Sequence, residues 1–384
     1  MPIADAPADW SKEWFEIDDA TYLNTAAGSP LPRVAVRAVQ TSLEASRSPH
    51  RITDGLFFEV PNRLRASLAT LIGGKPNEIA LTTGASTGMA ALSQLLDWNP
   101  GDEVITAKGE FPLQYATWKP MEDRGGITFT IVPARDRFIT ADDLIDAITP
   151  RTRAVSVSHV RFDDGSLLDA ARVAAACHAA GAVLVLDVSQ SCGAVPLDVD
   201  QMGVDFLVCA GYKWLLGPYG TGFFWARGQH LAKAHRRPFN WAAQDSETFS
   251  TLNFVDPEPS RSAKRWDAAE SATTFNLNLT AMDAAVDLVL RVGPARVREH
   301  NRALIESLFD NLPARCMPAS PLDPARRGPY GCFTGQTRDD TLDLYRRLRN
   351  EKVIVSMREG RIRVSPHVFN STQDIACLIR ALGA

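Results

Sequence analysis

The chain has 384 residues, of which 45% are hydrophobic and 22% are charged, so it is long enough to bury a large core and to divide into two domains. Its formal net charge of -4 and its scattered basic residues argue against nucleic acid or an anionic membrane as a partner. We therefore expect an ordinary soluble globular protein.

Neither the N-terminus nor the cysteines indicate export. The opening stretch, MPIADAPADWSKEWF, lacks the basic and apolar regions of a signal peptide, and no run reaches the roughly 18 apolar residues of a membrane span. The six cysteines show no C-x-x-C spacing and lie mostly in apolar segments, where a free cysteine behaves as a small hydrophobe. We expect a cytoplasmic protein with reduced cysteines and no metal site.

Helical and strand patterns alternate from about residue 62 onwards. Residues 62–74 have helical periodicity and end on two glycines, EIALTTG predicts a strand followed by a polar turn, and STGMAALSQLLDW predicts the next helix. Further short β-rich runs follow, some of them separated by helices such as 168–181: DEVITA, GITFTIVPA, TRAVSVSHV, AVLVLDV, VDFLVCAG and GTGFFWAR. This alternation predicts an α/β fold with a mostly parallel sheet that is covered on both faces.

The polar, proline-bearing stretch at 239–266 predicts a long loop or crossover. Beyond it, two helical patterns, the run CFTGQ, another helix and the strand pair VIVSM and RIRVSP indicate a smaller α+β domain. We expect an N-terminal segment at 1–24 that packs with the small domain, a large domain at 25–255 and the small domain at 256–384.

Polar residues that directly follow strands are the informative ones, because open α/β sheets bind ligands at the carboxyl ends of their strands. Ser86 begins a helix after one strand, which suits a phosphate or simply caps the helix. Asp187 ends a buried strand, where it either caps the next segment or keeps a heterocyclic ring nitrogen protonated. Lys213 follows the next strand, and a lysine among apolar residues requires pairing, a lowered pKa or covalent use.

Seven motifs in this order resemble the pyridoxal-phosphate enzymes of fold type I, specifically the aminotransferase class V group. They are YLNTAAGSPLP, TTGAST, GEFPLQYATW, SHVRFDDGSLLD, VLVLDVSQSCGAVPLDV, DFLVCAGYKWLLGPYGTGFFW and RIRVSPHVFNSTQDI. The group includes cysteine desulfurases, selenocysteine lyases, kynureninases and isopenicillin N epimerases. The resemblance implies a large domain with a sheet of the seven-stranded type, a homodimer, pyridoxal 5'-phosphate as cofactor and an L-amino acid as substrate.

The resemblance also implies a role for each cofactor-binding residue. Lys213 would form the Schiff base with the cofactor aldehyde and later move the proton at the substrate α-carbon. Asp187 would pair with the pyridinium nitrogen, Gln190 with the ring hydroxyl oxygen, and the ring of Phe111 would stack on the cofactor face. The residues that would hold the phosphate are Ala85, through its backbone N–H, Ser86 and Tyr212.

For the substrate, the resemblance implies that Arg363 clamps the α-carboxylate, a task suited to a planar guanidinium. Arg361, in the same strand, is expected to face the other side and to have another role. Asn24 is placed with Arg363 among the substrate-binding residues. For both Asn24 and His159, which lie in matched motifs, we expect a scaffold role rather than a catalytic one.

Three departures from the group bear on the reaction. Cysteine desulfurases carry a nucleophilic cysteine shortly before the carboxylate-binding arginine, and the corresponding segment here, VIVSMREGRIRVSP, contains no cysteine. Those enzymes stack a histidine where this chain has Phe111, and phenylalanine cannot move protons. Glu270 and Ser271 occupy the region where many members have a phosphate-binding threonine that reaches the neighbouring subunit's site.

From these observations we predict a carbon–sulfur lyase that eliminates at the β-carbon of a cysteine-derived substrate without an enzyme persulfide. An aminotransferase is the first alternative and an amino-acid epimerase the second. A non-catalytic scaffold protein with the same fold is a further alternative, and the joint presence of Lys213, Asp187 and Arg363 argues against it.

Overall fold

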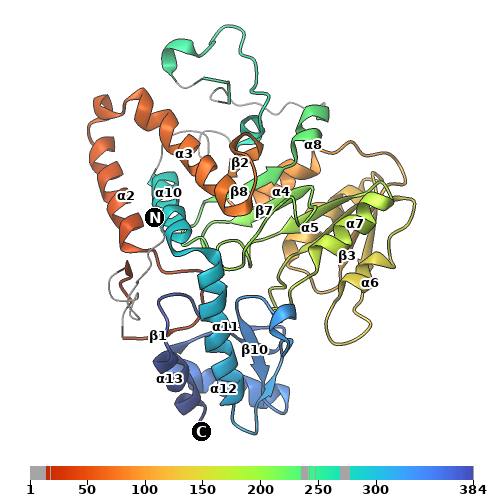
Figure 1. The fold of residues 1–384 in the computed structure, drawn as a ribbon, viewed down its shortest axis with the longest axis vertical. Coiled ribbons are helices and arrows are strands. Elements are labelled where there is room, and N and C mark those ends of the chain that lie inside the picture. The colour runs from red at the N-terminus through yellow and green to blue at the C-terminus, as the bar shows by residue number, and fades with distance from the viewer. Residues whose placement is uncertain are drawn as a thin grey trace.

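The computed structural model describes residues 14–17, 19–234, 241, 243–246, 248–268 and 277–383. In these ranges the chain forms a large central sheet covered by helices, with a second, smaller sheet near the C-terminus (Figure 1). No described helix has both the length and the apolar composition needed to cross a bilayer.

Seven strands of the described residues form the central sheet, in the order β2-β8-β7-β6-β5-β3-β4. β8 runs antiparallel to β2 and β7, and all the other neighbours are parallel. The predicted mostly parallel α/β sheet is therefore confirmed. The strands are β2 (Ile79–Thr82), β3 (Glu103–Ala107), β4 (Thr128–Val132), β5 (Thr152–Ser158), β6 (Val183–Asp187), β7 (Phe206–Ala210) and β8 (Gly222–Ala226).

Alternate residues of these strands fill two separate cores, because successive side chains point to opposite faces of a sheet. In β6, Val183 and Val185 belong to one core, while Leu184 and Leu186 belong to the other. The first core is covered by α4 (Ala85–Ser93), α5 (Pro112–Asp123) and the short α8 (Gly228–Lys233). The second is covered by α3 (Asp54–Ile72), α6 (Ala141–Ile145), α7 (Ala170–Ala179) and α10 (Leu277–Val292). Both faces are covered, as the apolar strand sequences predicted.

Two helices differ in length from their predicted ranges. α3 begins well before residue 62, at a cap formed by Thr53, and continues through Pro61 to its left-handed C-cap at Gly73. A proline is usually found at the start of a helix, which is why the sequence pattern suggested a later beginning. α4 ends at Ser93 rather than at residue 98, and the indole of Trp98 donates a 2.8 Å hydrogen bond to the Ser93 carbonyl.

The C-terminal sheet has the order β12-β13-β10-β9 and antiparallel pairing. Its strands are β9 (Met317–Pro318), β10 (Gly331–Thr334), β12 (Ser356–Arg358) and β13 (Arg361–Val364). The helices near this sheet, at the lower end of Figure 1, are α12 (Arg338–Asn350) and α13 (Thr372–Leu382), and the cyan α11 (Pro294–Asp310) runs from α10 down to them.

Long-range contacts link the N-terminal part of the chain to later segments. β1 (Thr21–Tyr22) pairs in parallel with β11 (Val353–Ile354), and α10 packs against α2 (Arg33–Ser46) and α3. Within the predicted loop at 239–266, the described residues form only two short 3₁₀ helices, Phe249–Thr251 and Ala263–Trp266. The domain limits at residues 24 and 255 stay a prediction.

Candidate active site

A cavity of about 310 Å³ lies where β6 and β7 end and α4 begins. This is the edge of the sheet at which the strand pattern predicted a ligand site. Six of the predicted site residues line it: Ala85, Ser86, Phe111, Asp187, Tyr212 and Lys213. Ser189 and Tyr219 also line it, and sequence reasoning missed both, although Tyr219 lies in the GPYGTG turn that directly follows the lysine segment.

The first turn of α4 is suited to an anion. Helix N-termini leave their first N–H groups without partners inside the helix, and no side chain caps α4 at Gly84. The Thr87 hydroxyl donates to the Gly84 carbonyl at 2.9 Å, so it does not accept from these N–H groups as a cap would. The N–H groups of Ala85 and Ser86 and the positive end of the helix dipole therefore favour a phosphate at this wall.

Lys213 presents a buried amine to the cavity. Its Nζ lies 5.5 Å from the ring centroid of Phe111 and 5.6 Å from that of Tyr212. Burial lowers the pKa of Lys213; the negative charge of Asp187 opposes this shift, and the positive charge of Arg363 adds to it. Among the described residues, no carboxylate oxygen lies within 4.0 Å of Nζ. An amine with a lowered pKa and no ion-pair partner is suited to covalent attachment.

The ring of Phe111 and the carboxylate of Asp187 belong to the same cavity. Phe111 is 39% exposed and meets Phe162 edge to face at 5.3 Å, so it is not a core residue. Asp187 is the last residue of β6, and its Oδ1 accepts a 2.8 Å hydrogen bond from the backbone N–H of Ser189. This bond holds the carboxylate in place while the residue lines the cavity.

Tyr212 stacks on Tyr219, with ring centroids 4.3 Å apart and planes inclined by 22°. The Tyr212 hydroxyl is a neutral hydrogen-bond donor at pH 7, and burial raises its pKa further above that pH. Tyr219 itself is 69% exposed. This wall of the cavity is therefore formed by a stacked pair of tyrosines, of which Tyr219 is the exposed one.

The described residues that line the cavity do not include Gln190. Its Nε2 donates to the Ala26 carbonyl at 3.0 Å, and its Oε1 accepts from the indole of Trp214 at 2.9 Å. These bonds fix the amide between the N-terminal segment and the lysine loop. The contact with the cofactor hydroxyl oxygen stays a prediction. It would have to use the one hydrogen of the Gln190 amide that these bonds leave over.

Arg363 is almost completely enclosed, with 1% of its surface exposed. Nε donates to the Ser356 hydroxyl at 3.2 Å, Nη1 donates to the Phe162 carbonyl at 2.8 Å, and the guanidinium lies 5.6 Å from the ring centroid of Tyr330. No carboxylate of the described residues forms an ion pair with it, and burial lowers its pKa. A buried cation without an anion is costly, which favours binding of a substrate carboxylate here.

The expectation that Arg361 faces away from Arg363 is wrong. Residues two apart in a strand share a face, and Arg361 donates to Asp163 Oδ2 at 2.8 Å while Arg363 bonds to the neighbouring Phe162 carbonyl. Their roles nevertheless differ, because Arg361 has a carboxylate partner in the protein.

Asn24 and His159 lie near these groups. Asn24 forms a parallel bridge with Ser365, and its Oδ1 is buried without a hydrogen-bond partner in the described part of the chain. His159 Nδ1 lies 3.0 Å from the Ser191 hydroxyl, and burial lowers the pKa of this imidazole to about 4. Asn24 is not among the described residues that line the cavity, so its predicted substrate contact stays a prediction, and the neutral imidazole of His159 fits a scaffold role.

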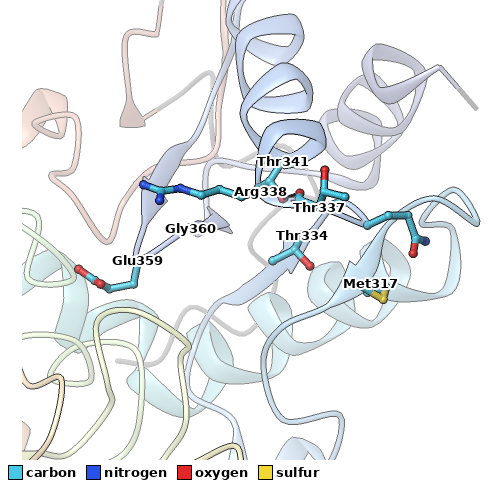
Figure 2. Close-up of a pocket in the computed structure, with 9 residues that line it drawn as sticks. Met317, Thr334, Thr337, Arg338, Thr341, Glu359 and Gly360 are labelled. Carbon is cyan, nitrogen blue, oxygen red and sulfur yellow. Dashed lines mark hydrogen bonds between the residues drawn. The ribbon is translucent and has the colours of Figure 1, made fainter.

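A larger groove of about 720 Å³ lies away from these residues, beside the β12–β13 turn and the start of α12. Figure 2 shows Glu359 and Arg338 at one end of the groove and Met317 at the other. None of the predicted site residues lines it. Glu270 and Ser271, which were considered for the phosphate contact, lie outside the described residues.

Comparisons with known proteins agree with this geometry. A family model described as Aminotransferase class-V matches residues 21–381. The chain is 29% identical over 398 residues to isopenicillin N epimerase of Streptomyces clavuligerus, with 99% of each chain covered. It is 24% identical over 384 residues to a probable cysteine desulfurase of Methanothermobacter thermautotrophicus, covering 94% of this chain and 93% of that relative.

Two solved structures have the same fold over nearly the whole chain. The cystine C–S lyase C-DES, in complex with its reaction product cysteine persulfide, gives a TM-score of 0.84 at 23% identity, with 95% of this chain and 97% of that chain covered. The apo cysteine desulfurase from Thermococcus onnurineus gives 0.83 at 18% identity, with 99% and 98% covered.

Proposed function

Since this chain belongs to the aminotransferase class-V family of pyridoxal-phosphate enzymes, we propose that it is a carbon–sulfur lyase acting at the β-carbon of a cysteine-derived amino acid. The family and the cavity agree on the cofactor. The uncapped start of α4 fits the phosphate, the buried Lys213 amine fits the aldehyde and the Asp187 carboxylate fits the ring nitrogen. When bound, this cofactor makes the substrate α-carbon acidic by drawing electrons from it.

The protein's own groups would then divide the work. Arg363, which pairs with no carboxylate of the described residues, binds the substrate α-carboxylate and orients the α-carbon. Lys213 Nζ, whose pKa is lowered by burial, removes the α-proton as a general base. Asp187 would keep the ring nitrogen of the bound cofactor protonated, and the Phe111 ring would pack against that ring.

The observation that favours a lyase over a desulfurase is the state of the cysteines. All six are free thiols, and five of them are buried. Burial raises the pKa of both Cys177 and Cys332 to about 12, and it also raises those of Cys209 and Cys316. Only a thiolate attacks sulfur efficiently, and no cysteine precedes Arg363 in residues 353–362. Sulfur would therefore leave as a small thiol, and water would hydrolyse the remaining aminoacrylate, whose three carbons give pyruvate and whose nitrogen gives ammonia.

Incubation of the holoenzyme with S-substituted cysteines tests this proposal. Stoichiometric pyruvate, ammonia and free thiol are expected. The aminotransferase alternative instead predicts the amine form of the cofactor, which a 2-oxo acid would restore. Accumulation of that form without thiol release would contradict the lyase proposal.

An epimerase is a second candidate, because the similarity to isopenicillin N epimerase extends over 99% of both chains. It predicts exchange of the substrate α-hydrogen with solvent deuterium and formation of the D-amino acid, with no release of thiol. Chiral chromatography of the same incubations separates this outcome from elimination.

The assembly and compartment are proposals as well. We expect a homodimer, as the resemblance to the family implies, in which a partner chain would cover the exposed Tyr219 at the cavity wall. We also expect a reducing compartment such as the cytoplasm, since every cysteine is a free thiol.

A further inference from the structure

The β12–β13 hairpin carries three arginines on one face. Its register pairs Ser356 with Arg363 and Arg358 with Arg361 across the two strands. Directly opposed residues of an antiparallel pair lie on the same face of the sheet, as do residues two apart in one strand. The face that holds the predicted carboxylate-binding Arg363 therefore also holds Arg358 and Arg361.

Two of these three arginines have defined partners in the protein. Arg361 forms an ion pair with Asp163, and Arg363 donates to Ser356 and to the Phe162 carbonyl. For Arg358, the one side-chain hydrogen bond within the described part of the chain is from Nη1 to the carbonyl of Met357, its own neighbour in the chain, at 2.9 Å. No carboxylate in the described ranges pairs with it.

Arg358 is half-buried and lies within electrostatic reach of the reaction centre. Burial is the main cause that lowers the pKa of Lys213 and of Arg363, and the positive charge of Arg358 lowers both further. Along the hairpin, Arg358 is the last strand residue before the turn at Glu359 and Gly360, which borders the open groove in Figure 2. It thus stands between the enclosed Arg363 and solvent.

Like charges placed directly opposite each other on a sheet are destabilising, and Arg358 opposes Arg361 in this way. The Asp163 carboxylate compensates Arg361, so among the described residues two positive charges on this face, those of Arg358 and Arg363, remain without a counter-charge. Diagonal neighbours across an antiparallel pair lie about 7–8 Å apart, which is the relation of Arg358 to Arg363. One small molecule with two anionic ends could contact both side chains.

We propose that Arg358 binds a second carboxylate, at the end of the substrate side chain, while Arg363 binds the α-carboxylate. The substrate class is then an amino acid whose side chain ends in a carboxylate, and under the proposed lyase function it is a cysteine with a carboxylate-bearing group on sulfur. This inference rests on the assignment of Arg363 to the α-carboxylate in the proposed function.

The kinetic test uses two substrates of nearly equal size, S-carboxymethyl-L-cysteine and its neutral amide, S-carbamoylmethyl-L-cysteine. The acid is expected to be preferred in kcat/KM by about 10- to 100-fold, mainly through KM, as befits one charge-assisted contact. Arg358→Gln should remove the preference. Arg338→Gln, which changes an exposed arginine of the groove in Figure 2, should retain it. Equal use of acid and amide by the wild type, or a preference that survives in Arg358→Gln, overturns the inference.

A binding test separates failure of this inference from failure of the lyase proposal. Calorimetry of the holoenzyme with glutarate and with butyrate, neither of which has an amino group, requires no turnover. Glutarate is expected to bind more tightly than butyrate, and Arg358→Gln should weaken glutarate alone. If this pattern holds while no substrate yields thiol, the inference stands and the lyase proposal fails. If Arg358→Gln weakens both acids equally or neither, the inference is wrong whatever the reaction is.

Discussion

The amine of Lys213 and the guanidinium of Arg363 are two buried cations that have no carboxylate ion pair among the described residues. A protein rarely keeps such groups unless a ligand or a covalent bond compensates them. In this fold both compensations are available, because the cofactor aldehyde would consume the amine and the substrate carboxylate would pair with the guanidinium.

Replacement of Lys213 by alanine should lower the turnover rate by several orders of magnitude, since it removes both the covalent attachment and the α-proton base. The cofactor should still bind through the start of α4 and Asp187. Retained cofactor after gel filtration, measured by visible absorbance, checks binding, and pyruvate release checks turnover. Lys119→Ala, at an exposed lysine of α5, is the control and should behave as wild type. Near-normal turnover of Lys213→Ala would sink the assignment.

Arg363→Lys keeps the charge but loses the planar two-pronged donor. Substrate binding should weaken by about 1.5–3 kcal/mol, seen as a raised KM, while cofactor affinity stays unchanged. Titration of the apoprotein with cofactor provides the second measurement. A variant that binds substrate normally, or that loses cofactor instead, contradicts the role of Arg363.

His159 should make stability depend on pH. Burial lowers its pKa from 6.5 to about 4, so the unfolded chain binds more protons between these pH values. The free energy of unfolding should therefore fall as pH decreases from about 6.5 to 4, by up to about 3 kcal/mol from this residue. His159→Asn offers an amide to Ser191 but does not titrate. Denaturant unfolding at both pH values should show a smaller loss in this variant, and an equal loss would count against the buried neutral imidazole.

At the scale of elements, the phosphate site depends on how closely β8 passes the start of α4. A Cβ on Gly222 would lie 2.5 Å from the Cys209 carbonyl oxygen and 2.7 Å from the Gly84 Cα. Both obstacles are backbone atoms, so neither can rotate away. The glycine thus permits the contact between β7, β8 and the N-terminus of α4 that places the anion-binding N–H groups.

Gly222→Ala should destabilise the protein by about 1–3 kcal/mol through overpacking and should also weaken cofactor binding, because α4 must shift. Thermal unfolding and cofactor titration measure the two effects. Gly55→Ala is the matched control, since a Cβ there meets only side-chain atoms at 3.6 Å or more. A Gly222→Ala protein with normal stability and normal cofactor affinity would show that this contact is not tight.

For the whole molecule, we expect a dimer in which the partner covers the outer side of the Tyr212–Tyr219 pair. Light scattering should return twice the mass of the 384-residue chain for the active enzyme. Tyr219→Glu, which places a charge on the 69% exposed ring position, should shift the equilibrium toward monomers and lower cofactor affinity. An active monomer would overturn the expectation.

Local sequence patterns were sufficient for the α/β class and for one half of the site. The apolar strands and the helices between them predict a parallel sheet, and the carboxyl-end rule then brings Asp187, Lys213 and the start of α4 to one edge. These inferences succeed because each depends on a few neighbouring residues and on the geometry common to all such sheets.

Tertiary structure alone decided the remaining features. The packing of the β12–β13 hairpin gives Arg361 a carboxylate partner in Asp163, and its register places Arg358 diagonally across from Arg363. The engagement of Gln190 by Ala26 and Trp214 likewise joins segments far apart in the chain. Such contacts depend on long-range packing. The same strand sequence can pack against another segment or face solvent, and local periodicity does not distinguish a packed face from an exposed one.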